Sequence, residues 1–251
     1  MSSKTLVLIT GANQGLGYYA AQQMAATGKY HVLIGARDIK KAESAIQQLA
    51  SDSSLKVDAG SLEPLLIDAN SDESIDAAAK AVEQKHGRLD ILMVNAGIAG
   101  DQAATASKSL RQTYREHYET NVFGAVQTVE SFLPLLKKST VPGGKRIAFT
   151  SSGLSSLEYA LQDGIYSAEN YTVYRSTKTA LNMIMLGYAK SLEKEGFVVS
   201  ASDPGYCGTN LNSYAGMKDP RDGAKVLVRA AVESKDQVHA HVIDEEKFEP
   251  W

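Results

Sequence analysis

Short apolar runs alternate with longer amphipathic stretches along nearly the whole chain, and this alternation constrains its fold more than any other feature. The runs that predict strands are residues 6–9, 32–34, 65–67, 91–94, 147–149, 197–199 and, more weakly, 238–243. Helical periodicity fills residues 16–27, 39–50, 74–86, 110–137, 173–195 and 224–233. The runs stay apolar on both faces, which is typical of a sheet covered on both sides. The pattern therefore predicts an α/β fold, a doubly wound sheet of about seven parallel strands with helices on both faces.

The composition suits one large folded unit. The chain has 251 residues without an internal repeat, a low-complexity tract or a linker, so residues 1–251 are predicted to form a single domain. Hydrophobic residues make up 43%, and 26 basic against 29 acidic residues leave a net charge of −3, which argues against disorder and against nucleic acid as a partner. No apolar run approaches the roughly 18 residues that span a bilayer. We expect a cytoplasmic protein with no membrane partner.

Cysteine and histidine usage predicts no metal site. The single cysteine, Cys207, excludes an internal disulfide and a thiolate cluster, and suits a reducing compartment. The histidines have no HExxH spacing, and the one close pair, His239 and His241, falls in the weak strand 238–243.

A glycine-rich turn follows the first predicted strand. Residues 10–17 read Thr-Gly-Ala-Asn-Gln-Gly-Leu-Gly, a TGxxxGxG pattern, and a helix begins there. Glycines allow a tight turn and let backbone N–H groups approach a pyrophosphate at the helix N-terminus. Glycines also serve ordinary turns, but the position after the first strand favours dinucleotide binding.

The end of the second predicted strand indicates which dinucleotide would bind. Arg37 stands 20 positions after Gly17, where a carboxylate would hold a free ribose 2′-hydroxyl and an arginine would pair with a 2′-phosphate. Asp38 follows directly, and the alternative is that Arg37 pairs with Asp38 or with solvent. The positive charge of Arg37 favours NADP(H) over NAD(H).

Tyr174 and Lys178 stand four residues apart, hence on one face of a predicted helix. An ammonium group beside a tyrosine favours the phenolate and lowers the tyrosine pKa, which would suit proton transfer. A tyrosine and a lysine at this spacing are also a common surface pair, so their position in the fold decides between the two interpretations. Ser151 and Ser152 follow the strand 147–149, where hydroxyls at the carboxyl end of a strand can bind a substrate oxygen.

Six motifs occur in a fixed order from Thr10 to Thr209. They are TGxxxGxG at 10–17, Asn95-Ala96-Gly97, Asn121, Ser152, YxxxK at 174–178 and Pro204-Gly205-Tyr206-Cys207-Gly208-Thr209. In this set the chain resembles the short-chain dehydrogenase/reductase family in its single-domain form. The resemblance covers nearly the whole chain and implies a Rossmann-type fold.

The resemblance implies roles for individual residues. Tyr174 would be the general acid–base, Lys178 would lower its pKa and hold the nicotinamide ribose, and Ser152 would orient the substrate carbonyl. Asn121 would complete the catalytic set through a water held by its backbone carbonyl. The residues that would contact the cofactor are Gly11, Asn13, Gln14, Gly15, Leu16, Gly17, Arg37, Asp68, Asn95, Ala96, Gly97, Tyr174, Lys178, Pro204, Gly205 and Thr209.

One spacing departs from the common family pattern. Tyr174 comes 22 residues after Ser152, so the segment 153–172 carries an insertion. Such insertions resemble those of the carbonyl-reductase branch, in which they can cover a dimerisation surface. The sequence therefore leaves open whether the protein is a monomer or a homo-oligomer.

The implied activity is NADPH-dependent reduction of a ketone or aldehyde to an alcohol. Loop composition around 153–172 and 206–220 favours a partly apolar or cyclic small-molecule substrate. Tyr166, Tyr171 and Tyr206 either line that pocket or fill the surface, and Cys207 is expected to be an inert buried thiol. The alternatives are an NADP-dependent alcohol dehydrogenase working oxidatively and a non-catalytic NADP(H)-binding protein.

Overall fold

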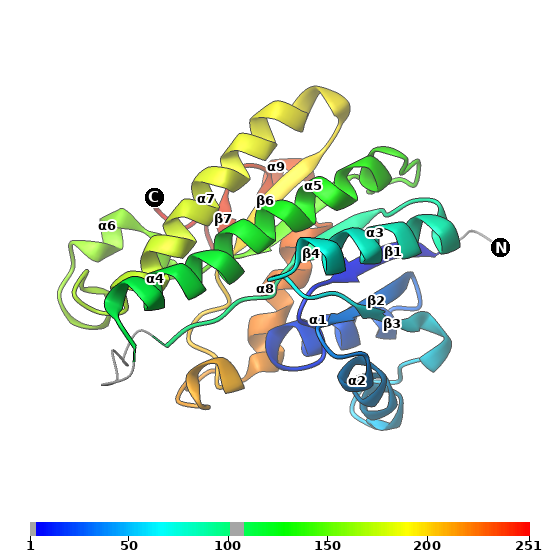
Figure 1. The fold of residues 1–251 in the computed structure, drawn as a ribbon, viewed down its shortest axis with the longest axis horizontal. Coiled ribbons are helices and arrows are strands. Elements are labelled where there is room, and N and C mark those ends of the chain that lie inside the picture. Colours follow the sequence, from blue (N-terminus) through cyan, green and yellow to red (C-terminus); the bar gives the residue numbers. More distant parts are fainter. Residues whose placement is uncertain (1–3, 101–107) are drawn as a thin grey trace.

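A seven-stranded sheet, parallel at every pairing, forms the centre of the protein (Figure 1). The computed structural model describes residues 4–100 and 108–251. The strand order is β3-β2-β1-β4-β5-β6-β7. The strands are β1 Thr5–Ile9, β2 Tyr30–Ala36, β3 Leu62–Leu66, β4 Ile91–Val94, β5 Arg146–Thr150, β6 Val198–Ser202 and β7 Val242–Ile243. The order reverses between β1 and β4, and open α/β sheets bind ligands at such a reversal.

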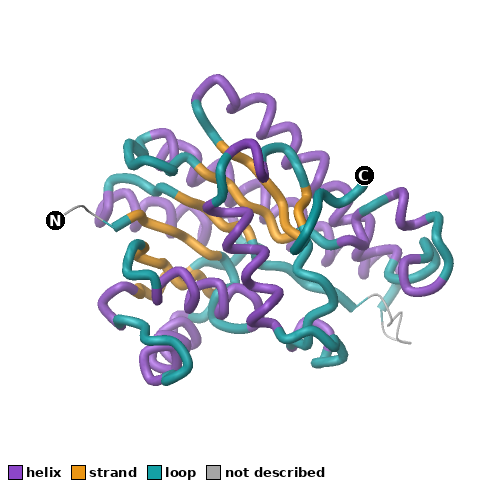
Figure 2. The backbone as a smooth tube through the Cα atoms, turned by 180° about the vertical axis from the view of Figure 1, so that it is seen from behind, coloured by secondary structure: helices purple, strands orange, loops and turns teal. Residues whose placement is uncertain are grey.

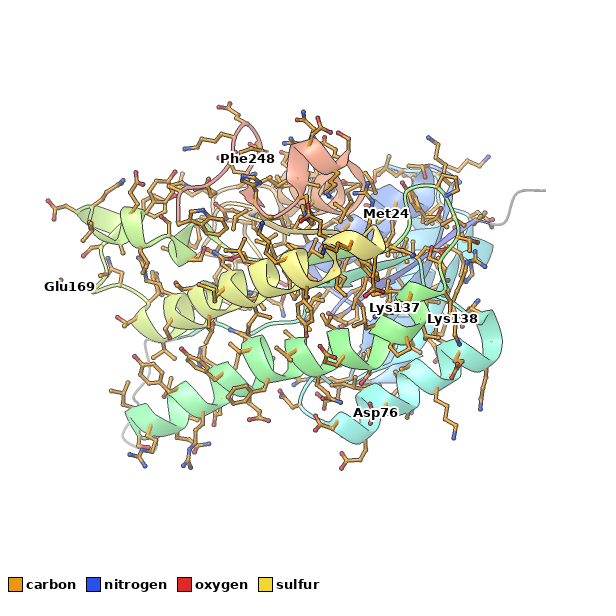
Figure 3. The ribbon with its side chains drawn as sticks, turned by 90° about the horizontal axis from the view of Figure 1, so that it is seen from above. Met24, Asp76, Lys137, Lys138, Glu169 and Phe248 are labelled. Carbon is orange, nitrogen blue, oxygen red and sulfur yellow. The ribbon has the colours of Figure 1, made fainter. Side chains whose placement is uncertain are left out.

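Helices cover both faces of this sheet, as Figure 2 shows from behind. Helices α1, α2 and α8 pack on one face, whereas α3, α5 and α7 lie side by side on the other (Figure 3). The helices are α1 Gly15–Ala26, α2 Ile39–Ser51, α3 Asp72–His86, α4 Leu110–Tyr118, α5 Gly124–Lys137, α6 Leu157–Ala160, α7 Thr172–Leu192, α8 Pro220–Val232 and α9 Lys235–Val238. No helix in the described part of the chain has the length and apolar character needed to cross a bilayer.

Alternating side chains of the strands supply two separate cores. In β1, Leu6 and Leu8 belong to the core under α3, α5 and α7, whereas Val7 and Ile9 belong to the core under α1, α2 and α8. Successive strand residues point to opposite faces, so a strand buried on both sides must be apolar throughout. The expected doubly wound parallel sheet is confirmed.

Two predicted elements differ from the observed ones. The strand predicted at 238–243 is wrong over its first half, because Val238 ends helix α9 and Ala240 turns the chain with φ +60°. His239 and His241 therefore lie in a turn before β7. The helix predicted at 110–137 is divided into α4 and α5 by a π-helical turn at Glu119–Phe123.

Two glycines in helices allow a matched test of packing on the α3, α5 and α7 face. A Cβ at Gly124, the first residue of α5, would lie 2.0 Å from the carbonyl oxygen of Ala69, whereas a Cβ at Gly187 in α7 would meet nothing within 4 Å. We expect Gly124→Ala to lower the free energy of unfolding by about 1–3 kcal/mol through backbone displacement. Gly187→Ala should raise it by up to about 1 kcal/mol through helix propensity. Chemical denaturation measures both, and equal effects of the two substitutions would contradict this packing.

Candidate active site

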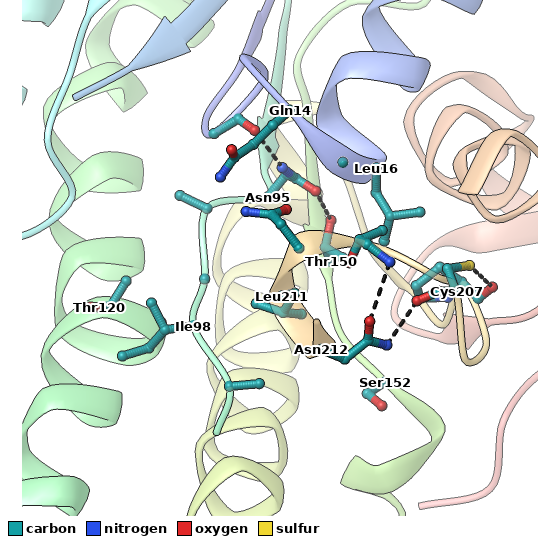
Figure 4. Close-up of a pocket in the computed structure, with 18 of the residues that line it drawn as sticks. Gln14, Leu16, Asn95, Ile98, Thr120, Thr150, Ser152, Cys207, Leu211 and Asn212 are labelled. Atoms are coloured by element: carbon teal, nitrogen blue, oxygen red, sulfur yellow. Dashed lines mark hydrogen bonds between the residues drawn. The ribbon is translucent and has the colours of Figure 1, made fainter. Parts of the chain in front are cut away.

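A cavity of about 520 Å³ lies at the carboxyl ends of the central strands (Figure 4). It receives residues from the turn after β1, the end of β2, the segments after β4 and β5, helix α7 and the loop after β6. The predicted site residues that line it are Gly11, Asn13, Gln14, Gly15, Leu16, Arg37, Asp68, Asn95, Ala96, Gly97, Ser152, Tyr174, Lys178, Pro204, Gly205 and Thr209. Gly17 and Asn121 are not among its lining residues.

The glycine-rich turn has the backbone geometry that its sequence predicts. Gly11 and Gly15 have φ values of +67° and +60°, which side-chain-bearing residues rarely adopt. Gly17 serves packing, because a Cβ there would lie 2.6 Å from Asn95 Nδ2 and 2.9 Å from the Gly11 carbonyl oxygen. At the N-cap of α1, Gln14 makes no side-chain capping bond, and the first turn of this helix holds no acidic residue. A helix N-terminus of this kind fits the phosphates of a dinucleotide.

Hydrogen bonds join the carboxyl ends of β1, β4 and β5. Thr10 Oγ1 accepts from the backbone N–H groups of Asn95 and Ala96, at 3.0 Å each. Asn95 Nδ2 donates to the Thr10 carbonyl oxygen at 2.8 Å. Thr150 Oγ1 donates to Asn95 Oδ1 at 3.2 Å (Figure 4). No local sequence pattern indicates these contacts of Thr10 and Thr150, since their partners lie far away along the chain.

The far end of the cavity, beside β2, carries positive charge. Arg37 is exposed and lines this end together with Lys41, which the sequence analysis missed. The Asp38 carboxylate accepts a hydrogen bond from the Lys40 backbone N–H at 3.0 Å and so caps α2. Asp68 also lines this end, and its Oδ1 accepts from the Asn70 backbone N–H. Two cations at the rim fit an anionic group.

Lys178 is buried beside Tyr174 on α7. Its side chain is only 4% exposed, its Nζ donates to the Thr150 carbonyl oxygen at 2.7 Å, and Nζ lies 5.6 Å from the centroid of the Tyr174 ring. Burial lowers the pKa of Lys178 to about 8, because an ammonium group loses hydration there. The predicted Tyr–Lys pair is thus brought together in the cavity.

The two serines after β5 have different surroundings. Ser151 Oγ donates to Asn182 Oδ1 at 2.6 Å, and the Ser151 side chain is buried. Ser152 is half-exposed at the cavity wall, where its Oγ accepts from the Leu154 backbone N–H at 3.2 Å. A hydroxyl that accepts this bond still has its proton free to donate. Ser152 therefore suits substrate binding better than Ser151.

Asn121 lies behind the cavity wall, in the π-helical turn between α4 and α5. Its side-chain amide donates to the Ile98 carbonyl oxygen at 2.9 Å and to Thr177 Oγ1 at 3.0 Å, and its Oδ1 accepts from the Ile98 backbone N–H at 2.8 Å. These three bonds hold the segment after β4 against α7. The side chain of Asn121 thus has a positioning contact that sequence reasoning did not find.

The loop after β6 is closed by Asn212. Its Oδ1 accepts from the Thr209 backbone N–H at 3.2 Å, and its Nδ2 donates to the Cys207 carbonyl oxygen at 2.8 Å (Figure 4). Cys207 is buried, and burial raises the pKa of its thiol to about 11. A thiol of this kind is a poor nucleophile at neutral pH.

Arg175 holds the inserted segment 153–172 in place. This side chain is 6% exposed, and its Nη1 donates to the carbonyl oxygens of Tyr166 and Ser167 at 2.7 and 3.2 Å. Tyr166, Tyr171 and Tyr206 all line the cavity, so each of the three belongs to its wall.

Comparison with known proteins identifies the family. The family model described as short chain dehydrogenase matches residues 5–219. The chain belongs to the short-chain dehydrogenase/reductase family. Members of this family are NAD(P)(H)-dependent oxidoreductases that act on CH–OH and C=O groups.

Several individual proteins resemble this short-chain dehydrogenase/reductase over most of its length. The short-chain dehydrogenase anuI of Penicillium roqueforti is 45% identical over 248 residues, covering 97% of this chain and 95% of that protein. The (+)-neomenthol dehydrogenase of Arabidopsis thaliana is 29% identical, with 90% of each chain covered. The NADPH-bound carbonyl reductase from chicken fatty liver is 25% identical with a TM-score of 0.81, covering 99% of this chain and 100% of that one.

The buried ammonium of Lys178 makes stability depend on pH. Its pKa is about 8 in the folded chain against 10.5 in a solvated lysine, so the unfolded chain holds this proton more tightly. The buried charge therefore lowers the free energy of unfolding by its full amount below pH 8, and this destabilisation disappears as the pH rises through 10.5. At pH 7 it amounts to about 3 kcal/mol.

Replacement by a neutral side chain should remove this pH dependence. We expect the cofactor-free Lys178→Met variant to have a higher free energy of unfolding than wild type at pH 7. This difference should shrink between pH 8 and pH 10. Urea denaturation at each pH measures it. Lys190→Met, at an exposed position of the same helix, is the matched control. A difference that stays constant over this pH range for Lys178→Met would contradict the burial of a charged lysine.

Proposed function

We propose that this protein reduces a ketone or aldehyde to an alcohol with NADPH, using Tyr174 as the proton donor. One observation carries the proposal: the Tyr174 ring, the Lys178 ammonium and the Ser152 hydroxyl meet in a cavity whose other end holds a glycine-rich turn and Arg37. The order of these groups along one cavity matches the order of reacting carbonyl, nicotinamide and phosphates that such a reaction needs.

The residues present fit a dinucleotide. The uncapped N-terminus of α1 would hold the pyrophosphate, and Gly11 and Gly15 allow backbone N–H groups to approach it. Arg37, with Lys41 beside it, would bind a 2′-phosphate, which favours NADP(H) over NAD(H). Asp38 offers little competition, since its carboxylate caps α2. The NADPH-bound carbonyl reductase from chicken supports the same cofactor.

When bound, NADPH supplies the hydride. The Tyr174 hydroxyl donates its proton to the substrate oxygen, while the Ser152 hydroxyl donates a hydrogen bond to the same oxygen and stabilises its developing charge. The Lys178 ammonium, fixed by the Thr150 carbonyl oxygen, favours the phenolate that Tyr174 becomes. Asn121 positions the segment after β4 against α7 and so fixes the cavity wall.

Apolar and aromatic groups at the Tyr174 end favour a partly apolar or cyclic substrate. Leu154, Leu211 and the rings of Tyr166, Tyr171 and Tyr206 line the cavity, and the Asp203 carboxylate lies among them. The likeness to a neomenthol dehydrogenase also supports a cyclic substrate. The segments 153–172 and 206–220 would therefore determine substrate specificity within a single catalytic domain. The same residues serve the oxidative direction, so an NADP-dependent alcohol dehydrogenase is the second candidate.

Removal of one hydroxyl tests the proposed proton donor. We expect Tyr174→Phe to reduce kcat by at least about 100-fold and to leave NADPH affinity within a factor of about three, because the ring keeps its packing. Tyr214→Phe, at a 72% exposed tyrosine outside the cavity, should change neither quantity. Steady-state turnover and fluorescence titration measure the two effects. Turnover of Tyr174→Phe near the wild-type rate would overturn the assignment.

The cofactor assignment is tested at Arg37. We expect Arg37→Ala to weaken NADPH binding by about 10- to 100-fold and NADH binding by less than about threefold, because only NADPH carries the 2′-phosphate. Lys40→Ala removes a neighbouring exposed cation that does not line the cavity, and should affect neither cofactor. Titration calorimetry gives both affinities. An equal loss for NADPH and NADH would contradict the role of Arg37.

A further inference from the structure

Three potential metal ligands meet at the edge of the sheet opposite the cavity. They are His31 near the start of β2, Glu63 in β3 and His86 at the end of α3. Their ligand atoms all lie within 4.8 Å of one another. Glu63 Oε2 lies 3.1 Å from His31 Nε2 and 3.2 Å from His86 Nε2, so both rings face the same carboxylate oxygen.

The fold brings these residues together by register. His31 stands two positions before Leu33, and Glu63 two positions before Leu65, so both point to the face that carries the α3, α5 and α7 core. Leu33 pairs with Glu63 across the two strands. On α3, His86 stands four positions after the buried Val82 and therefore also faces the sheet. All three side chains are 18–24% exposed, which leaves a path for an ion.

The existing contacts leave one nitrogen unsatisfied. His86 Nε2 is buried and has no hydrogen-bond partner, although it lies 3.2 Å from the carboxylate. A buried imidazole nitrogen that faces a carboxylate oxygen without an aligned hydrogen bond is suited to metal binding.

We propose that His31, Glu63 and His86 form a binding site for a divalent transition-metal ion of the zinc type. Two imidazoles and a carboxylate are a ligand set that zinc accepts, with water in the fourth position. A tetrahedral ion with bonds of about 2.0–2.1 Å separates its ligands by about 3.3 Å, close to the 3.1 and 3.2 Å between each imidazole and the carboxylate. Magnesium, which requires oxygen ligands, does not fit.

Lys85 distinguishes this site from a simple ion-pair cluster. Its Nζ lies 2.9 Å from Glu63 Oε1, and its side chain is 62% exposed. An ammonium group at this distance opposes a divalent cation on the same carboxylate, and an exposed lysine is free to turn into solvent. Removal of Lys85 should therefore tighten metal binding, whereas it would only weaken a cluster built for ion pairing. The site stabilises the amino-terminal edge of the sheet and is independent of the proposed reaction.

The test uses the full chain without an affinity tag, freed of metal with a chelator and titrated with zinc chloride in a calorimeter. We expect His31→Gln, Glu63→Gln and His86→Gln each to weaken zinc binding by about tenfold or more. Lys85→Gln should tighten it several-fold. Zinc should also raise the Tm of wild type and of Lys85→Gln, because the folded chain alone holds the site.

Controls separate the site from other sources of zinc affinity. Glu83→Gln removes an exposed carboxylate of α3 that pairs with Lys138, and should leave zinc affinity unchanged. Melting curves without metal establish that each variant is folded, and Lys85→Gln keeps the test decisive even if a histidine variant unfolds. The proposal is overturned if wild type binds no zinc, if Lys85→Gln does not bind zinc more tightly, or if a His239→Gln/His241→Gln double variant abolishes the binding.

Discussion

A series of hydrogen bonds across the carboxyl ends of β5, β4 and β1 links the buried Lys178 to the glycine-rich turn. Lys178 donates to the Thr150 carbonyl, the Thr150 hydroxyl donates to Asn95, and Asn95 donates to the Thr10 carbonyl. These hydrogen bonds can form because the strands are parallel and end together at one edge of the sheet. Through these bonds the Lys178 end and the glycine-rich end of the cavity are fixed relative to each other.

This arrangement has an energetic cost in the cofactor-free protein. Lys178 is buried in a position where hydration of its ammonium is lost, and the lowered pKa of about 8 reflects that loss. Two apolar cores, one on each face of the sheet, offset it. Helix α7 holds a further buried cation, Arg175, whose desolvation is compensated by backbone carbonyls of Tyr166 and Ser167. Both buried cations hold residues of the cavity wall in place.

Most of the fold was predictable because both faces of the sheet are buried. Strands such as β1 are then apolar throughout, and a glycine turn or an i,i+4 pair such as Tyr174 and Lys178 is local in sequence. The turn at Ala240 and the side-chain contacts of Asn121 depend on tertiary packing, so the weak strand 238–243 was partly wrong. The cluster of His31, Glu63 and His86 was missed for the same reason, since strand register unites residues that no sequence spacing connects.

We propose that this cavity performs carbonyl reduction. The most direct measurement is NADPH consumption by the purified chain against aldehydes, cyclic ketones, quinones and polyketide-like ketones, with the alcohol product detected by mass spectrometry. We expect turnover of at least one of these classes, greatest for partly apolar or cyclic carbonyls, with one alcohol formed for each NADPH consumed. Tight NADPH binding without turnover of any class would contradict it, and would indicate a protein that binds the cofactor without catalysis.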